Sequence, residues 1–462
     1  MKEKYMNLLN IFKDKKERQA YAYIISLTIP IVIQNLFNSA VNSADVLMLN
    51  SVGQDAISAV SMASQYSNIL GNIFMGLGSG VAMLSAQYWG KRDLKVIKKV
   101  QGIGLRFCLL VTLFFTIPSL LCPEVMMTLY TNDSHLIYLG AKYLRIVGIS
   151  HLFWAMTETF VFTMRSIERV KLCSYINIFA LLLNVGLNAV FIYGLLGAPQ
   201  LGVVGVALAT AISRVAQLAI CLIVSHYSKD IKLHLGAIFE KNPVLLQDFI
   251  RLSFPALVNS LVWSVAFSMY TAIMGHLSSD VVAANSIVSV VRNFGAVFCY
   301  AVAGSSGIYI GKSIGAGRME EAKANSMRSM VLMFTTGLVG GILIFLSIPF
   351  VLQVASLSEM AMKYLKIMLY INCVYIMGSA VNSTMITGIF RAGGDSKFGM
   401  ICDFIDMWLY AVPIGVISAF VLKLPPMIVY VLLCTDEFVK WPWVFKHYRS
   451  GKWMKNITRD FD

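Results

Sequence analysis

The stretch LTIPIVIQNL at residues 27–36 returns as LSFPALVNSL at residues 252–261, 225 positions later. Both stretches are mostly apolar, and both carry a proline at the same place. The same separation relates further identical residues: Asp55 and Asp280, Ala59 and Ala284, Gly90 and Gly315, Lys98 and Lys323. Near the end of each half, MRSIERVK at residues 164–171 corresponds to FRAGGDSK at residues 390–397. The chain therefore consists of two copies of one design.

The composition is that of a membrane protein. Of 462 residues, 57% are hydrophobic and 13% are charged, with a mean hydropathy of +0.70, whereas soluble domains carry about 25% charged residues. A membrane-spanning helix needs about 20 apolar residues, and the runs here are too long for β-barrel strands. The apolar runs predict twelve spans, at about 21–49, 56–89, 101–122, 136–164, 172–197, 202–226, 247–276, 281–312, 326–353, 362–390, 398–422 and 424–448.

The repeat sets the arrangement of these spans. Six spans in each half form an even number, so both halves enter the membrane in the same direction, as a parallel repeat about an axis along the membrane normal. We expect an all-α membrane protein with two six-helix bundles. The expected parts are an N-terminal tail (1–20), the first bundle (21–226), a linker (227–246), the second bundle (247–448) and a C-terminal tail (449–462).

The net charge of +14 reflects membrane topology. Thirty of the 38 Lys and Arg residues fall in the two tails and in alternate loops, and only five fall in the opposite loops. The positive-inside rule then places both termini in the cytoplasm, in a multi-pass protein of the cell membrane. The first apolar run is long enough to remain as a span, so no cleavable signal is expected. The basic tail KHYRSGKWMKN is expected to face lipid headgroups rather than nucleic acid.

Several other classes of function lack a motif. The eight cysteines show no CxxC spacing and the six histidines no HExxH, so neither a metal centre nor a disulfide framework is indicated. SGIYIGKS at residues 306–313 resembles the end of a phosphate-binding loop, but it lacks the required first glycine. Since no nucleophile and base can be assembled, we expect neither an enzyme nor a bound cofactor.

Polar residues follow one face of the first span. Asn35, Asn38, Asn42 and Asp45 are spaced three, four and three apart, which places them on the same side of a helix. An ionised carboxylate costs about 2.5–3.5 kcal/mol at the centre of a membrane helix, so this face must line protein or a water-filled cavity.

Further polar residues are expected at the depth of Asp45. Asn184 and Asn188 are one turn apart in the fifth span, and Thr210 lies at a similar level in the sixth. Together with Asp45 they offer an all-oxygen set that suits Na⁺, or a proton carried by the carboxyl group. A buried polar network that only fixes helix packing is the alternative.

The second half differs at the matching positions. There the polar stripe becomes Ser260, Trp263, Phe267 and Tyr270. A cavity with carboxylate and amide groups on one side and aromatic rings on the other suits lipophilic organic cations, because cation–π contacts contribute about 0.5–2 kcal/mol. The predicted substrate cavity is lined by Asn35, Asn38, Asn42, Trp263, Phe267 and Tyr270. An aromatic stripe of this spacing also occurs in ordinary helix cores.

The remaining charges inside spans are expected to pair rather than to bind ligands. Glu158 shares a helix face with His151 and Trp154. Arg214, one turn from Thr210, is a possible partner of Asp45, and Arg292 has no evident partner. Four acids of the last two spans, together with Glu158, are expected to pair with arginines of the loops: Asp403, Asp406, Asp436 and Glu437.

Three stretches resemble the multidrug and toxic compound extrusion (MATE) family: DVLMLNSVGQDAISAVSMA (45–63), NVGLNAVFIYG (184–194) and GVVGVALATAIS (202–213). The resemblance covers nearly the whole chain. It implies a secondary antiporter that exports cationic, amphipathic compounds in exchange for Na⁺ or H⁺. It also implies that Asp45, Asn184 and Thr210 correspond to the first-span Asp, fifth-span Asn and sixth-span Thr of the family.

The sequence departs from the family pattern at three positions. Asn188 stands where many members have Asp, and Trp263 and Ala380 stand where some branches carry acids in spans seven and ten. Asp45 is therefore the principal candidate for ion coupling, with Na⁺ and H⁺ both open. The predicted partners are small organic cations and the lipid bilayer, and the predicted state is a monomer. The alternative is a flippase or exporter of a lipid-linked or anionic substrate, in which Arg214 and Arg292 hold phosphate.

Overall fold

The computed structural model describes residues 14–228, 232 and 235–461, and within them it leaves out the side chains of residues 42, 43, 45–47 and 50. The described residues are mainly helical and contain no strand. Eleven of their helices are long and apolar enough to cross a membrane. The predicted all-α membrane fold is confirmed.

The first half is a bundle of long helices. Several begin with an aspartate whose side chain accepts backbone N–H groups of the first turn, as at Asp14, Asp93 and Asp133. The helices are α2 (Lys15–Asn50), α3 (Gln54–Lys91), α4 (Leu94–Leu121), the short α5 (Pro123–Thr128), α6 (Ser134–Ser166), α7 (Val170–Tyr193) and α8 (Gly202–Tyr227).

The second half repeats this order. Its helices are α9 (Pro243–Leu277), α10 (Ser279–Gly315), α11 (Met319–Val354) and α12 (Glu359–Asn382), which continues as the π-helical η3 (Ser383–Phe390). Next comes a segment formed by α13 (Ser396–Phe404), η4 (Ile405–Ala411), α14 (Val412–Val416) and η5 (Ile417–Val421). The chain then forms α15 (Pro426–Cys434), α16 (Asp436–Val439) and α17 (Trp441–Ser450).

The last predicted span, 424–448, is not one continuous helix. The chain instead forms α15, α16 and α17, with breaks at Thr435 and Lys440. Pro442 lies in the first turn of α17 and has no N–H to continue the hydrogen-bond pattern. The acidic α16 and Lys440 are buried within the second bundle. Prolines in the middle of α2 and α9 do not interrupt those helices.

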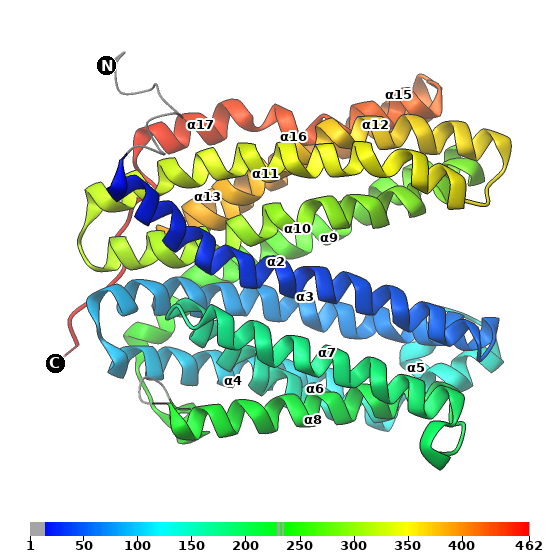
Figure 1. Cartoon of the computed structure of the whole chain (residues 1–462), viewed down its shortest axis with the longest axis horizontal. Helices are drawn as coiled ribbons and strands as arrows, with labels where there is room; N and C mark the ends of the chain where they lie inside the picture. The colour runs from blue at the N-terminus through cyan, green and yellow to red at the C-terminus, as the bar shows by residue number, and fades with distance from the viewer. Residues whose placement is uncertain (1–13, 229–231, 233–234, 462) are drawn as a thin grey trace.

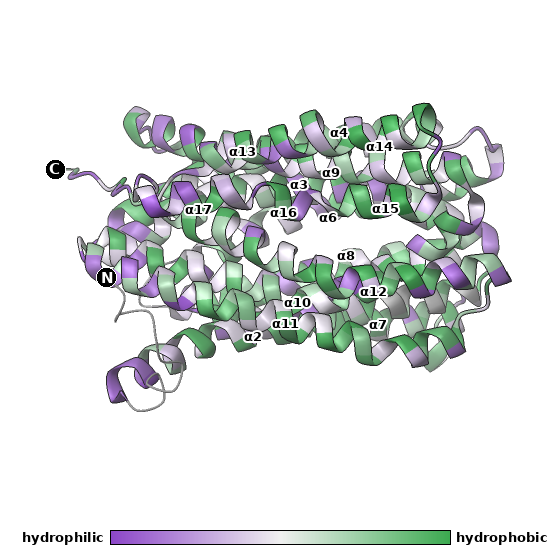
Figure 2. Ribbon diagram, turned by 90° about the horizontal axis from the view of Figure 1, so that it is seen from above, coloured by the Kyte–Doolittle hydropathy of each residue, from purple (hydrophilic) through white to green (hydrophobic). Residues whose placement is uncertain are grey.

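Figure 1 shows the long helices lying side by side along the longest axis, with α3–α8 in the lower half of the view and α10–α17 in the upper half. We call the end of the molecule where α2 begins and the described chain stops the terminal end, and the opposite one the far end. Hydrophobic residues extend along the helices, and hydrophilic residues gather towards the ends (Figure 2). The halves meet mainly where α3 packs against α9 and α10, and where α2 packs against α10.

Repeat-related glycines form the seam between the bundles at the terminal end. A Cβ atom on Gly90 of α3 would lie 2.0 Å from the carbonyl oxygen of Lys312, and one on Gly315 of α10 would lie 1.8 Å from that of Gln87. Gln87 and Lys312 are themselves 225 positions apart. The contact is therefore the same in both directions, and only glycine permits the backbones to approach so closely.

The C-terminal segment lies across this seam. The side chain of Gln87 donates to the carbonyl oxygens of Ala392 and Lys455, and it accepts the backbone N–H of Ile457. Arg459 forms two hydrogen bonds with Asp248 of α9, at 2.7 and 2.8 Å. The segment thus connects elements of both halves at the terminal end.

Candidate functional site

A cavity of about 700 Å³ lies between the two bundles. Asn35 and Asn38 of α2 and Trp263 of α9, three of the residues predicted to line a cavity, are among those that line it. Its charged lining residues are Arg165, Arg391 and Asp403. The other lining groups are mainly amides, small residues, methionines and aromatic rings. Both halves contribute to this cavity, as two bundles around a shared site would require.

Of the other three residues predicted to line the cavity, two lie away from it, and the side chain of the third is not described. Phe267 packs against Trp263, with 5.0 Å between ring centroids, and against Tyr270, at 5.6 Å. Neither Phe267 nor Tyr270 is among the residues that line the cavity. The side chain of Asn42 lies outside the part of the chain that the structure describes.

The two cavity arginines are related by the repeat. Arg165 and Arg391 occupy matching places in the stretches MRSIERVK and FRAGGDSK. Arg165 donates to Gln34 of α2 at 3.2 Å, and Arg391 donates to Asn259 of α9 at 2.9 Å. Gln34 and Asn259 also match, 225 positions apart. Sequence reasoning missed this pair, although an arginine retained in both copies next to a span was a usable signal.

The predicted oxygen cluster of the first bundle comes together in part. Asn184 donates to the Thr210 hydroxyl, and Asn188 donates to the Asn184 amide oxygen, both at 3.4 Å. Asn188 is almost fully buried. Asp45 lies on α2, which packs against α7, but its carboxylate is among the side chains outside the description. Its place in the ion site therefore stays a prediction.

Arg214 is held by α6. Its guanidinium donates to the Ser150 hydroxyl at 3.0 Å and lies 4.4 Å from the centre of the Trp154 ring. The Trp154 indole in turn donates to Glu158 at 3.1 Å. The possible pair with Asp45 stays a prediction, because the Asp45 side chain is not described. His151, predicted on the same helix face, contacts the Ser67 hydroxyl at 3.0 Å.

The acids of the last two spans do not pair with loop arginines as expected. Three of them pair with Lys440, whose ammonium group lies 3.1 Å from Asp403, 3.2 Å from Asp406 and 3.7 Å from Glu437, while Asp436 accepts a hydrogen bond from Tyr270. Lys440, in the last span, lies among these acids within the second bundle, and burial makes an unpaired carboxylate too costly. We call Asp403, Asp406, Asp436, Glu437 and Lys440 the lysine–carboxylate cluster. Lysine three residues after glutamate inside an apolar run was the signal for it.

Neutral donors extend the lysine–carboxylate cluster in three directions. Asn259 donates to Asp403 at 2.7 Å, and the Tyr270 hydroxyl donates to Asp436 at 3.1 Å. The amide of Asn382 donates to the side chain and the backbone carbonyl of Glu437. Since Asn259 also receives Arg391, and both line the cavity, a chain of polar contacts runs from the cavity into the cluster.

Aromatic rings cover the two intramembrane cations of the second bundle. The Lys440 ammonium lies 5.3 Å from the centre of the Trp263 ring. Arg292, for which the sequence offered no partner, lies 5.7 Å from the Phe267 ring and 5.6 Å from the Tyr375 ring. The predicted aromatic stripe thus faces protein cations at one side and, through Trp263, the cavity at the other.

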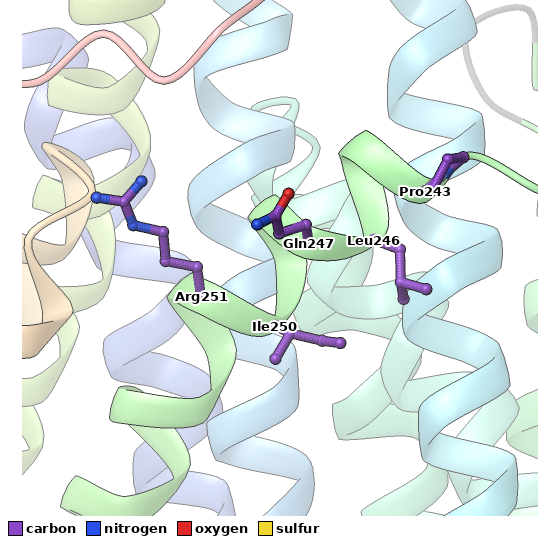
Figure 3. Close-up of a pocket in the computed structure, with 5 residues that line it drawn as sticks. All are labelled: Pro243, Leu246, Gln247, Ile250 and Arg251. Carbon is purple, nitrogen blue, oxygen red and sulfur yellow. The ribbon is translucent and has the colours of Figure 1, made fainter.

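A second hollow belongs to α9 alone. Figure 3 shows its five lining residues on the first turns of that helix: Pro243, Leu246, Gln247, Ile250 and Arg251. Its lining, as far as the structure describes the chain, includes one charged group and no residue of the first bundle. The cavity between the bundles is therefore the candidate binding site. Among the described residues, no group of His, Cys, Asp and Glu side chains is placed to hold a metal ion.

Comparisons with known proteins agree with this architecture. A family model described as MatE matches residues 30–190 and 255–417, one segment in each half. The chain is 23% identical over 454 residues to the uncharacterized transporter YisQ of Bacillus subtilis (strain 168), covering 96% of this chain and 97% of the relative. It is 20% identical to the probable multidrug resistance protein NorM of Thermotoga maritima, covering 95% and 94% of the two chains.

Solved structures share the fold. An outward-facing multidrug resistance MATE family transporter of the MOP superfamily superposes with a TM-score of 0.83 at 19% identity, covering 93% of this chain and 96% of that one. A MOP superfamily transporter from Pyrococcus furiosus, whose structure is reported to have a binding pocket of reverse polarity, matches with the same score and coverage at 18% identity. At such identities the likeness concerns the fold alone.

Proposed function

Because the chain belongs to the MATE family of multidrug and toxic compound transporters, we propose that it exports amphipathic organic compounds, chiefly lipophilic cations, in exchange for Na⁺ or H⁺. The observation that carries this proposal is the cavity between the bundles. A volume of about 700 Å³ falls in the range of about 300–1,000 Å³ that is usual for drug-sized ligands. Its lining combines rings and methionines with amides, which bind varied amphipathic molecules.

The preference for cations rests on charges that face or adjoin the cavity. Asp403 lines the cavity directly. Trp263 also lines it, and its ring lies next to Lys440 of the lysine–carboxylate cluster, to which Asp403 belongs. The two cavity arginines are partly satisfied by Gln34 and Asn259. Rings and a carboxylate together provide the attraction that a lipophilic cation needs.

We place ion coupling in the first bundle. Asn184, Asn188 and Thr210 bring amide and hydroxyl oxygens together on α7 and α8, and Asp45 on the neighbouring α2 would supply the negative charge. Such a set fits Na⁺, or a proton held on the carboxyl group. Alternating access follows from the repeat, by rocking of one bundle against the other across the glycine seam. Both termini are proposed to face the cytoplasm, and the protein is proposed to be a monomer of the cell membrane.

One observation favours a second candidate function. In the part of the chain that the structure describes, two arginines and one aspartate are the charged groups that line the cavity, so an anionic or lipid-linked substrate has two guanidinium groups available. Arginine binds phosphate and carboxylate in a fork geometry. An exporter or flippase of such substrates would use the same two-bundle scaffold.

Transport by purified protein distinguishes the candidates. Protein in liposomes is given ethidium or an anionic fluorescent dye, under Na⁺ and proton gradients imposed separately. We expect ethidium transport driven by one of the gradients and little transport of the anionic dye. Gradient-driven movement of the anionic dye alone would replace the cation exporter with the second candidate.

A further inference from the structure

The lysine–carboxylate cluster is buried to an unusual degree. The exposed fractions are 2% for Asp403, 1% for Asp406 and Asp436, and 0% for Glu437 and Lys440. Three of these carboxyl groups lie within ion-pair distance of the one ammonium group, and the fourth, that of Asp436, accepts the Tyr270 hydroxyl. Taking an unpaired carboxylate out of water costs several kcal/mol, on the order of the whole stability of many domains.

The surroundings do not supply enough positive charge. Among the described residues, two arginines approach the cluster: Arg391 reaches it through Asn259, and Arg292 lies over the neighbouring rings of Phe267 and Tyr375. Even with both included, four carboxyl groups face three cations. The other titratable groups nearby are neutral hydroxyls and thiols from α9, α10, α12, α13 and α15: Tyr270, Tyr300, Tyr375, Tyr430, Cys299, Cys402 and Cys434. At least one carboxyl group must be neutralised by a proton or by a bound cation.

Hydrogen bonds identify which carboxyl group is the least supported as an anion. Asp403, Asp436 and Glu437 each accept a hydrogen bond from a neutral side chain, which favours the charged form. Asp406 has only the ion pair with Lys440 at 3.2 Å, and its Oδ1 atom is buried without a hydrogen-bond partner among the described residues.

Other oxygens at the cluster are also unsatisfied. The Oε1 atom of Glu437 and the Oδ1 atom of Asn382 are buried with no hydrogen-bond partner in the described chain. Asn382 is 2% exposed, and its amide nitrogen donates to Glu437. A buried oxygen without a donor costs about 1–3 kcal/mol, so these atoms indicate a missing proton donor. The Lys440 ammonium already occupies the position where three carboxylates meet. A metal ion would need that position, so a proton is the ligand that fits the remaining oxygens.

We propose that the lysine–carboxylate cluster is a proton-binding site of the second bundle, with the exchangeable proton on Asp406, and that a cation bound in the cavity releases this proton. The release of the proton by a bound cation rests on the proposed function, whereas the proton site itself does not. This site is separate from the one predicted around Asp45, which lies in the other bundle.

The route of coupling runs through Lys440. Its ammonium is shared almost equally between Asp403 and Asp406, at 3.1 and 3.2 Å. A cation in the cavity beside Asp403 satisfies that carboxylate and leaves more of the ammonium charge to Asp406. A stronger positive charge next to Asp406 favours its ionised form, so the proton leaves the Asp406 carboxyl group and is released to solvent. One cation is bound and one proton is released.

Infrared spectroscopy of the purified protein tests the proton site without any substrate. We expect a carbonyl stretching band of a protonated carboxyl group at neutral pH, which disappears in Asp406→Asn and returns at a shifted position in Asp406→Glu. The band should persist in Asp45→Asn, Glu158→Gln and the exposed control Glu124→Gln, whose glutamate pairs with Arg145. Persistence of the whole band in Asp406→Asn would overturn the proposal. If Asp406→Asn does not fold, a band that stays unshifted in Asp406→Glu overturns it equally.

Proton release on ligand binding tests the coupling. Tetraphenylphosphonium is added to purified protein in weakly buffered solution with a pH indicator. Wild-type protein should release close to one proton per bound cation, and Asp406→Asn should bind the cation but release few or none. Binding without release in the wild type, or equal release in the variant, would overturn the coupling. Absence of binding by the wild type contradicts the proposed cation substrate, and the infrared measurement then decides the proton site by itself.

Discussion

At the scale of single residues, the interior of this protein depends on charges that balance one another. Lys440 satisfies three carboxylates at once, and Arg165 and Arg391 each contact an amide at a repeat-related position. The sequence predicted that charges inside spans pair, but it did not predict the partners. Spacing along a helix indicates which residues share a face, whereas the partner across a bundle depends on packing that no local pattern contains.

Replacing Lys440 by methionine should destabilise the protein strongly. Removing the cation of a buried pair leaves uncompensated carboxylates, at a cost of about 3–5 kcal/mol. The loss should shrink at low pH, because protonation neutralises the same carboxyl groups. Thermal unfolding of purified protein measures this effect. Lys363→Met is the matched control, since Lys363 is 63% exposed and surface pairs contribute at most about 1 kcal/mol. Equal melting of the two variants would contradict the account.

Replacing Arg165 by glutamine should strengthen the binding of cations. The change removes a positive charge from the cavity lining while keeping a donor for Gln34. We expect a few-fold lower Kd for tetraphenylphosphonium. Repulsion between two positive charges across a partly hydrated cavity amounts to about 1 kcal/mol, and the substitution removes it. Equilibrium binding of labelled ligand measures it. Weaker binding of cations by this variant would show that Arg165 serves mainly to position other groups.

At the scale of elements, the helices follow from sequence more closely than the site does. Long apolar runs and the repeat predicted an all-α membrane protein made of two similar halves, because those features are local or are copied between halves. The break of the final segment into α15, α16 and α17 was missed. Its apolar content matches a span, whereas the interruption reflects both Pro442, which has no N–H, and the burial of the α16 acids beside Lys440.

The glycine seam gives a prediction for paired elements. In Gly90→Val, the new Cβ atom would lie 2.0 Å from the Lys312 carbonyl oxygen, so α3 and α10 must separate at the terminal end. We expect greater labelling of cysteines introduced there and slower transport. Gly186→Ala is the control, because a Cβ atom at Gly186 meets nothing within 4 Å. Unchanged labelling in Gly90→Val would show that contact between α3 and α10 at this seam does not close the terminal end during transport.

At the scale of the whole molecule, two similar bundles are joined by the glycine seam between α3 and α10 and by the segment that follows α17. The segment after α17 contacts Gln87 of α3 and Asp248 of α9, which belong to different halves. The parallel repeat explains why the bundles match, and the unequal side chains explain why they differ in role. The first bundle offers amides and hydroxyls, and the second offers rings and the lysine–carboxylate cluster.

Removing residues 453–462 should loosen the terminal end. The truncation deletes the hydrogen bonds to Gln87 and Asp248 and exposes the site of the buried Trp453. We expect faster hydrogen exchange in the adjoining ends of α3 and α9, with little change at the far end. Arg459→Ala should give a weaker version of the same pattern. Uniform exchange across both ends would contradict a clamping role for this segment.

Ion-driven export by Asp45→Asn tests the central claim most directly. Asparagine keeps the size of the side chain and one oxygen, but it can neither titrate nor carry the charge that the coupling site requires. The measurement is ethidium transport by purified protein in liposomes under the gradient that drives the wild type, with thermal unfolding as the control for folding. The account predicts a folded variant without gradient-driven transport. Full gradient-driven transport by a well-folded Asp45→Asn variant would contradict it.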